Sequence, residues 1–236
     1  MVAGVESVYQ LRVTLKGAQP PIWRRLQAPA AIDLRELHLL FQVVMGWHNE
    51  HLYEFRVGQR YFGEPEPKSS GLEGFGPPTQ DAGKTRLVEI APRAGSKFLY
   101  TYDMGDSWEH QVLVEKVLEA DPGGHLPACL AGERACPPED CGGVWGYGDI
   151  LTALQEPSAP QSAELLEWLE DGFEPDKFDL AAVNAQLSRW RTRAVASAPR
   201  VGEMTGGTLL AGFAAWELDR QSPLQAPLSG RCSPEE

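Results

Sequence analysis

One stretch constrains the fold more than any other, and it is KFLYTYDMGDSWEHQVLVEKVLE, residues 97–119. Apolar and polar side chains alternate on both sides of a short turn at 103–106, and this pattern predicts two antiparallel strands joined as a hairpin. In the second strand, Trp108 and His110 share a face with Val112 and Val114. We therefore expect His110 to point toward the interior.

A buried imidazole at position 110 needs a hydrogen-bond partner, and the turn offers one in Asp103 or Asp106. Two interpretations stay open at this point. His110 is either a hydrogen-bonded core histidine or a member of a His/Asp pair. Such a pair could bind a ligand or a cation, or it could move a proton.

The segments before this hairpin predict further strands and one helix. Residues 8–15 and 52–63 alternate as half-buried strands do, and two prolines at 20 and 21 favour a turn followed by an extended segment. Residues 33–46 predict a helix, because Asp33 and Glu36 form a capping-box pattern and Gly46 is a typical helix end.

The remaining segments complete the predicted architecture. Residues 63–84 are rich in glycine and proline and predict a flexible loop, and helical periodicity recurs at about 147–155, 162–170 and 176–190. This order predicts an α+β fold with a curved, mostly antiparallel sheet and helices packed on one side. We expect one domain at 1–191, followed by a C-terminal tail at 192–236 that is partly disordered.

The composition predicts a cytoplasmic globular protein. The N-terminal segment has neither the basic stretch nor the apolar run of a secretory signal, and no apolar run approaches the roughly 20 residues of a membrane helix.

The net charge is −12, yet residues 1–60 hold seven Lys and Arg against five Asp and Glu. A broadly basic nucleic-acid surface is therefore disfavoured, whereas a local basic surface near the N-terminus is compatible with the sequence.

The cysteines are candidate metal ligands, because a reducing compartment favours free or metal-bound thiols over disulfides. Cys129, Cys136 and Cys141 are spaced C-x6-C-x4-C, which lacks the paired C-x2-C pattern of a zinc knuckle. Three thiolates and an imidazole from His110 or His125 would still complete a tetrahedral zinc site. The alternatives are a disulfide between two of the cysteines and burial of all three as small apolar side chains.

Two further pairs of polar residues lie next to predicted turns. His48 and His51 follow the helix end and precede a strand, where they either project into a site, cap the helix or face solvent. Glu139 and Asp140 lie between two prolines and two glycines, so a rigid turn holds their carboxylates in place. Such a turn suits the rim of a pocket and, equally well, the start of the next helix.

Five segments carry a resemblance to a known family. They are PPIWRRL, LRELHLLFQVVMGWHNEHLYEF, FLYTYDMGDSWEHQVLVEKV, CLAGERACPPEDCGGVWGYGDIL and EWLEDGFEPDKFDLAAVNAQL. In this order, over about residues 7–190, they resemble the plasmid pRiA4b open-reading-frame-three-like family, whose members are also described as insertion-element passenger proteins with a resolvase-like (TnpR) label. The resemblance implies a bacterial or archaeal α+β domain linked to plasmids or mobile elements. It implies no settled biochemical activity.

This chain departs from the family pattern at two positions. The family's HLHxF begins here at His51 and has Tyr53 in place of the second histidine, while YDFGD has Met104 in place of its phenylalanine. If the second histidine were an obligate metal ligand, this chain would bind metal poorly, because a neutral phenol rarely ligates. Resolvase chemistry needs an activated serine among several arginines, and Arg24 and Arg25 are an isolated pair.

The candidate residues support three functional hypotheses. The first is a non-enzymatic binding or adaptor domain for a protein, peptide or nucleic-acid partner, which an exposed patch of Trp23, Arg24 and Arg25 would favour. The second is a small metal-assisted or acid/base hydrolase with a pocket of histidines and carboxylates. That set is His48, His51, Asp103, Asp106, His110, Glu139 and Asp140.

The third hypothesis is nucleic-acid binding through the basic N-terminal part, with a salt-dependent affinity. The common nucleotide-binding and hydrolase motifs, among them G-x-x-x-x-G-K-[ST], G-x-S-x-G and H-E-x-x-H, do not occur in the sequence. Zinc is the one cofactor that the sequence suggests, and neither the partner nor the oligomeric state follows from it.

Overall fold

The computed structural model describes residues 7–64, 78–121, 123–169 and 172–197. Its contacts divide the chain into two compact units, Met1–Arg189 and Trp190–Glu236. Of the second unit, the structure describes only the backbone of 190–197, which continues a helix that begins in the first unit. Most of the predicted tail, and most of the predicted loop at 63–84, therefore lie outside the described residues.

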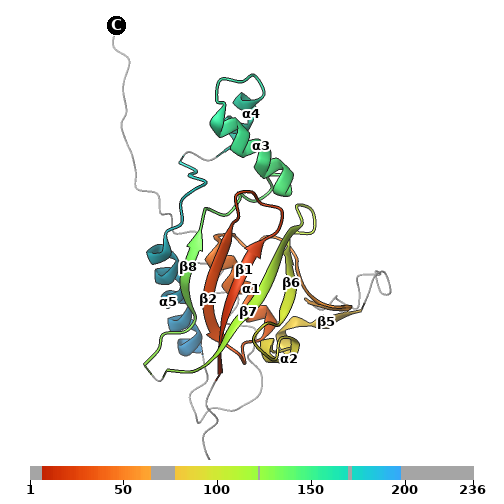
Figure 1. The fold of residues 1–236 in the computed structure, drawn as a ribbon, viewed down its shortest axis with the longest axis vertical. Helices are drawn as coiled ribbons and strands as arrows, with labels where there is room; N and C mark the ends of the chain where they lie inside the picture. Colours follow the sequence, from red (N-terminus) through yellow and green to blue (C-terminus); the bar gives the residue numbers. More distant parts are fainter. Residues whose placement is uncertain (1–6, 65–77, 122, 170–171, 198–236) are drawn as a thin grey trace, which may run out of the picture. The chain divides into compact units, whose positions relative to one another are not determined.

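An eight-stranded sheet forms the centre of the first unit, with the strand order β5-β4-β3-β6-β7-β1-β2-β8 (Figure 1). Its strands are β1 (Ser7–Leu15), β2 (Trp23–Pro29), β3 (Tyr53–Val57), β4 (Arg60–Gly63), β5 (Thr79–Asp81), β6 (Lys97–Tyr102), β7 (Trp108–Glu119) and β8 (Ala128–Glu133). All pairs are antiparallel except β4 with β5. This confirms the predicted α+β class and the mostly antiparallel sheet.

The predicted hairpin is the β6–β7 pair, in which Tyr102 lies opposite Trp108. Alternation along β7 turns Trp108, His110, Val112 and Val114 inward, and each is fully buried. Side chains from the same face of the neighbouring strands complete this part of the core. They include Leu11, Val13, Leu26, Phe55 and Tyr100.

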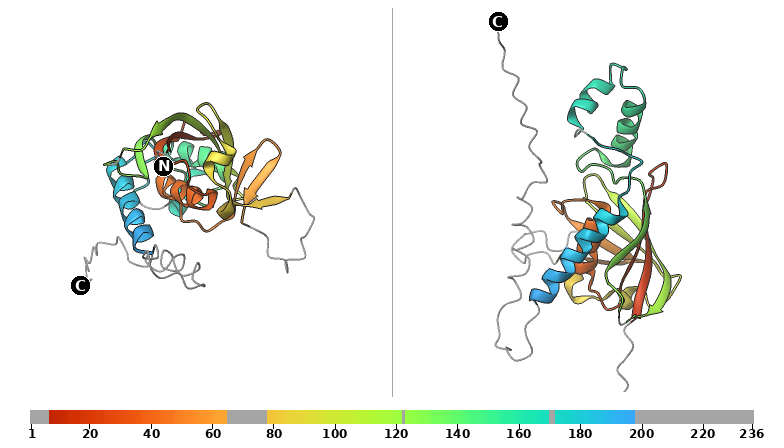
Figure 2. Two further views of the ribbon diagram at one scale, coloured as in Figure 1. Left: turned by 90° about the horizontal axis from the view of Figure 1, so that it is seen from below. Right: turned by 90° about the vertical axis from the view of Figure 1, so that its left-hand side faces the viewer.

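Helix α1 (Leu34–Met45) lies against the concave side of the curved sheet (Figure 2). The Asp33 carboxylate accepts a hydrogen bond from the Glu36 backbone N–H, and Gly46 ends the helix in the left-handed conformation, as the sequence predicted. Phe41 packs against the rings of Phe55 and Tyr100 on the sheet, with centroids 6.2 and 5.0 Å apart. An apolar stripe on α1 thus covers the sheet.

The other helical segments differ from the prediction at their ends. Helix α3 runs from Gly143 to Gln155, α4 from Ser162 to Trp168 and α5 from Leu180 to Ser197, and the short η1 (Ala82–Lys84) and α2 (Leu87–Ile90) were not predicted. Gly142 and Gly143 are both left-handed, with φ of 89° and 69°, so α3 begins at the second glycine of this turn, with Gly142 as its N-cap. No helix among the described residues is long and apolar enough to cross a membrane.

Arg24 is a buried cation on the inner face of β2, with only 1% of its surface exposed. Its Nε donates to the Val44 carbonyl at 2.8 Å, and its Nη1 donates to the carbonyls of Trp23 and Glu133, both at 2.9 Å. Val44 belongs to the last turn of α1, where free carbonyls and the helix dipole favour a positive charge. The guanidinium also lies over the Phe178 ring, 4.1 Å from its centroid.

We expect Arg24→Leu to lower the free energy of unfolding by about 3 kcal/mol, because it leaves buried carbonyls without donors. Arg25→Leu is the matched control. Arg25 faces the other side of β2 and forms a partly exposed ion pair with Glu115, so its loss should cost about 1 kcal/mol or less. Urea unfolding of both variants measures the difference. A larger loss for R25L than for R24L would contradict this assignment.

Candidate functional site

Strand pairing brings three loops to the same end of the sheet. Tyr53 at the start of β3 lies opposite Tyr102 at the end of β6, so the loop before β3 adjoins the β6–β7 turn. The start of β7 pairs with the end of β1, whose Thr14 lies opposite Trp23, and Trp23 lies opposite Glu133 at the end of β8. The loop that follows β8 therefore begins at this end too.

Hydrogen bonds join these three loops, 46–52, 103–107 and 134–142, which we call the loop site. The Asp103 N–H donates to the Leu52 carbonyl at 2.9 Å, and the Gly142 N–H donates to an Asp106 carboxylate oxygen at 3.1 Å. The His48 N–H donates to Glu139 Oε2 at 2.9 Å. The loops are thus held to one another by named contacts.

His51, Asp103 and Asp140, one from each loop, form the imidazole–carboxylate cluster. His51 Nε2 lies 3.2 Å from Asp140 Oδ1 and 3.7 Å from Asp103 Oδ2. One ligand atom from each side chain lies within 4.8 Å of the other two, and no other group of three His, Cys, Asp or Glu does so among the described residues. Three of the seven predicted pocket residues therefore come together.

Glu139 forms a second, adjacent group with His48 and Tyr102. Its carboxylate accepts a hydrogen bond from the Tyr102 hydroxyl and lies 2.9 Å from His48 Nδ1. The Tyr102 hydroxyl in turn accepts a hydrogen bond from the Glu50 N–H at 2.9 Å. Burial, reinforced by Glu139, raises the pKa of Tyr102 well above its ordinary value, so the hydroxyl keeps its proton and remains a donor.

A buried polar network holds loop 46–52 in place from the side of α1. The Tyr100 hydroxyl lies 2.8 Å from His38 Nδ1 and accepts a hydrogen bond from Gln42 Nε2 at 2.9 Å. The other ring nitrogen, His38 Nε2, lies 2.6 Å from Asn49 Oδ1. Asn49 Oδ1 accepts, so the His38 proton lies on Nε2. Burial lowers the pKa of His38 to about 4 and keeps the ring neutral.

The sequence contained a signal for this network that the prediction missed. His38 and Gln42 are four residues apart on the apolar face of α1, and polar side chains there need buried partners. The Gln42 side-chain oxygen accepts from the Asn49 N–H at 3.0 Å, and Asn49 has a left-handed backbone with a φ of 57°. The chain path between α1 and His51 is thereby fixed.

A cleft of about 570 Å³ adjoins the Glu139 group. Its walls combine apolar and polar groups: they include Trp47, Pro137, Pro138, Trp168, Leu169 and Phe173, together with the polar His48 and Glu139. Trp47 is fixed in this wall because its indole N–H donates to the Pro137 carbonyl at 3.1 Å. Trp168, which is 49% exposed, leaves a large apolar surface at the edge of the cleft.

His110 points inward as expected, but it has no acidic partner. Its Nδ1 lies 3.3 Å from the Tyr100 carbonyl, and its Nε2 has no hydrogen-bond partner among the described residues. Its ring packs instead between the rings of Trp47 and Tyr100, with centroids 5.3 and 5.4 Å away. Of the two interpretations, the His110/Asp pair does not form, since Asp103 turns toward His51, and His110 is a core histidine.

We expect the neutral state of His110 to make the protein sensitive to acid. Burial lowers the pKa of His110 to about 4, whereas the unfolded chain takes up this proton near the ordinary value of 6.5. The contribution of neutral His110 to the free energy of unfolding is therefore fully present above pH 6.5 and is lost as the pH falls from 6.5 toward 4. Between pH 7 and pH 4.5, the wild type should lose about 2 kcal/mol more than His110→Leu. Urea unfolding across this pH range measures the difference. Parallel stability curves for the two proteins would contradict it.

The predicted zinc ligands do not assemble. Cys129, Cys136 and Cys141 carry free thiols, and these do not join His110 or His125 in a cluster of three or more ligand atoms among the described residues. Burial raises the pKa of Cys141 to about 12 and that of Cys136 well above its ordinary value, so both thiols keep their protons in this structure. His125 lies on an exposed segment between β7 and β8.

The predicted exposed patch of Trp23, Arg24 and Arg25 does not form, because Arg24 lies in the core. Trp23 and Arg25 lie on the outer face of β2, where the Trp23 indole donates to Glu133 at 2.9 Å. Arg25 makes two hydrogen bonds to the Glu115 carboxylate, at 2.7 and 2.9 Å. Alternation along β2 separates the two arginines, since neighbouring residues of a strand point to opposite faces.

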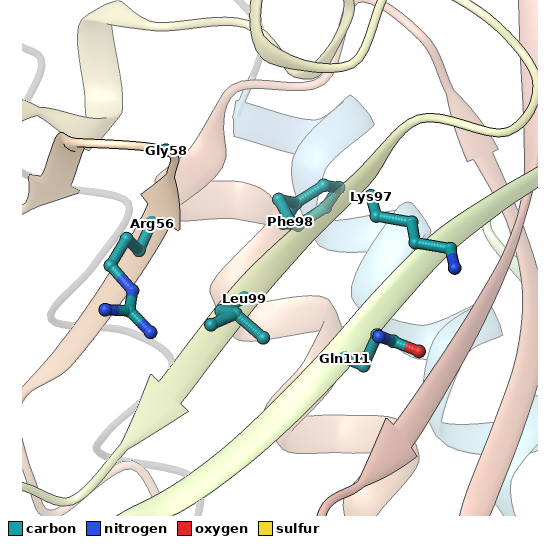
Figure 3. A pocket seen from close by; sticks show the side chains of 6 residues that line it. All are labelled: Arg56, Gly58, Lys97, Phe98, Leu99 and Gln111. Carbon is teal, nitrogen blue, oxygen red and sulfur yellow. The ribbon is translucent and has the colours of Figure 1, made fainter.

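A second depression, of about 330 Å³, lies on the outer face of the sheet over β3, β6 and β7 (Figure 3). It is lined by Arg56, Gly58, Lys97, Phe98, Leu99 and Gln111. None of the predicted site residues is among them. The chemistry-bearing side chains gather at the loop site instead.

The fold and the loop site define an α+β domain with an open, curved sheet and a polar cluster at one end of it. The family model described as plasmid pRiA4b ORF-3-like protein matches residues 7–182, and the chain belongs to this family. The uncharacterized protein y4hQ of Sinorhizobium fredii (strain NBRC 101917 / NGR234) is 40% identical over 187 residues, which cover 78% of this chain and 91% of that protein.

A solved structure supports the same fold. The crystal structure of a protein of unknown function, MM3350 from Methanosarcina mazei Go1, is 36% identical and superimposes with a TM-score of 0.65. The match covers 75% of this chain and 96% of that protein. The first relative is described as uncharacterized and the second as a protein of unknown function, so neither similarity indicates an activity.

Proposed function

We propose that the protein is a binding domain that recognises a peptide segment of a partner protein at the loop site. The observation that carries this proposal is the cleft beside Glu139. Its volume of about 570 Å³ falls in the range of ligand pockets, and its aromatic and proline walls offer a rigid apolar surface. Aromatic-lined grooves are a common means of peptide recognition.

The charges around the cleft favour a peptide that combines a basic with an apolar side chain. Glu139 contributes a carboxylate to the wall, and its side chain is only 11% exposed, so a cation placed there would be poorly screened by water. Asp140 follows directly in the chain, and Glu50 lies in the facing loop. Complementary charge at a partly buried position gives specificity for a basic partner.

Nucleic-acid binding through the N-terminal arginines gains no support from these contacts. Arg24 donates its hydrogen bonds to backbone carbonyls inside the domain, and Arg25 is paired with Glu115. The acidic loop site would repel phosphates. A cytoplasmic location and a link to mobile elements stay predictions from the sequence and the resemblance.

A metal-assisted or acid/base hydrolase is the second candidate. One observation favours it: His51, Asp103 and Asp140 meet at the loop site, next to the His48–Glu139 pair. A histidine held by a carboxylate can accept a proton, and carboxylates can hold a cation that polarises a substrate. Turnover of ester, amide or phosphodiester model substrates that is lost in Glu139→Gln would favour this candidate over the binding domain.

We expect a phage-displayed library of random peptides, selected on the full-length protein, to yield sequences that combine Lys or Arg with aromatic or aliphatic residues. A selected peptide should bind Trp168→Ala at least tenfold more weakly than wild type, because this side chain forms an exposed part of the cleft wall. Fluorescence polarisation with the labelled peptide gives the dissociation constants.

Trp145→Ala is the matched control for this experiment. Trp145 is 86% exposed and does not line the cleft, so its removal should leave the affinity for the peptide within twofold of wild type. The proposal fails if no peptide family is enriched. It also fails if both tryptophan variants bind the selected peptide equally well.

A further inference from the structure

We propose that His51, Asp103 and Asp140 bind one divalent first-row transition-metal ion. This inference deepens the proposed function by naming a cofactor of the loop site, and it rests on that site being the ligand-binding end of the domain. The three ligand atoms come from three separate loops. They meet only because strand pairing and the loop-to-loop hydrogen bonds bring them together.

The spacing of the donor atoms is that of ligands around a metal ion. Nitrogen and oxygen ligands lie about 2.1 Å from such an ion, so two of them are about 3.0 Å apart at an octahedral edge and about 3.4 Å apart at a tetrahedral one. His51 Nε2 lies 3.2 Å from Asp140 Oδ1 and 3.7 Å from Asp103 Oδ2. Both distances lie within a few tenths of an ångström of such an edge, and the two carboxylate oxygens lie within 4.8 Å of each other.

The His51 ring nitrogen provides an independent observation. Nε2 is shielded from solvent and has no hydrogen-bond partner among the described residues, although a carboxylate oxygen lies within 3.2 Å. The distance allows a hydrogen bond, but an N–H on this nitrogen would not point at the carboxylate oxygen. A buried imidazole nitrogen normally has a partner, and an ion bound between it and the two oxygens supplies one.

The charges of the cluster also favour a bound cation. Asp103 is 7% exposed and the Asp140 side chain 67%, and the ion-pair contacts of both within the described residues are to His51 alone. Two carboxylates that share a site repel each other unless a cation or a proton lies between them. A divalent cation neutralises both, and it leaves the imidazole neutral and able to ligate.

The donor set indicates which ions fit. Carboxylates suit Mg²⁺, Ca²⁺ and Mn²⁺, whereas an imidazole favours transition metals, so a mixed set of one nitrogen and two oxygens favours Mn²⁺, Fe²⁺ or Zn²⁺ over Mg²⁺. Three protein ligands leave coordination positions open. A carbonyl or carboxylate of the bound partner, or a water molecule, could occupy them. Tyr53 does not belong to this set, because its hydroxyl donates to Glu64.

The experiment is a titration of the chelator-treated, full-length protein with Mn²⁺ and with Zn²⁺. Loss of the free Mn²⁺ electron paramagnetic resonance signal, together with elemental analysis after dialysis against Zn²⁺, gives stoichiometry and affinity. We expect one equivalent of either ion and no displacement of Mn²⁺ by an equal concentration of Mg²⁺. Asp103→Asn, Asp140→Asn and His51→Gln should each weaken binding at least tenfold.

The asparagine variants should retain the fold. Asp103 and Asp140 are left-handed, with φ of 56° and 58°, and asparagine tolerates this conformation. The Asp103 side chain also accepts the Gly105 N–H at 2.7 Å, a contact that an amide oxygen preserves. Asp121→Asn is the matched control, because Asp121 accepts the Gly123 N–H in a similar turn beyond the other end of β7.

Metal affinity within twofold of wild type is expected for D121N. The inference is overturned if the wild type binds neither ion, or if the three cluster variants bind as tightly as D121N does. Peptide affinity measured in the presence of chelator separates this result from the proposed function. If the protein binds peptide but no metal ion, only the inference of a cation site is refuted. If it binds metal but no peptide, only the proposal of peptide recognition is refuted.

Discussion

The hydrogen bonds of Arg24 are the contact on which the loop site depends most. One guanidinium joins the last turn of α1, the start of β2 and the end of β8, through the carbonyls of Val44, Trp23 and Glu133. Loop 46–52 begins two residues after Val44, and loop 134–142 begins directly after Glu133. A buried cation without a carboxylate partner is costly, so these carbonyls and the Phe178 ring must all be in place for it to be stable. Arg24 thereby fixes where two of the three loops start.

The third loop is fixed by the hairpin, and the site follows from the two constraints together. Tyr102 pairs with Trp108 at the end of β6, so Asp103 opens the turn, and the Asp103 N–H donates to the Leu52 carbonyl in the first loop. Five polar residues of these loops have left-handed backbones, and three of them, Asn49, Asp103 and Asp140, are asparagine or aspartate; the other two are Ser107 and Arg134. Asparagine and aspartate tolerate this conformation best among residues with side chains, and their polar groups are then directed by the turn itself. Polar side chains therefore gather at this end of the sheet because its turns need residues that tolerate the left-handed conformation.

The local patterns predicted much of the fold and part of the site. Alternation identified β1, β6 and β7, and the caps of α1 were identified from Asp33 and Gly46, because these signals depend on neighbours a few residues apart. The predicted set of pocket residues included all three members of the imidazole–carboxylate cluster. It also included His110, which shares its strand face with apolar residues and packs between Trp47 and Tyr100, away from any carboxylate that hydrogen-bonds it. Sequence adjacency to an acidic turn was a poor guide to a buried ring.

The sequence by itself determined the strands other than β5 and β8, the hairpin, the first helix and the turn residues that carry polar side chains, because each is encoded by periodicity or by a local backbone preference. Only the tertiary structure decided which of these side chains meet. The pairing of His51 with Asp103 and Asp140, the burial of Arg24 among three carbonyls and the failure of the cysteines to gather all depend on contacts between residues far apart in the chain. No local pattern records such contacts, because strand order and register are set by the packing of the whole core.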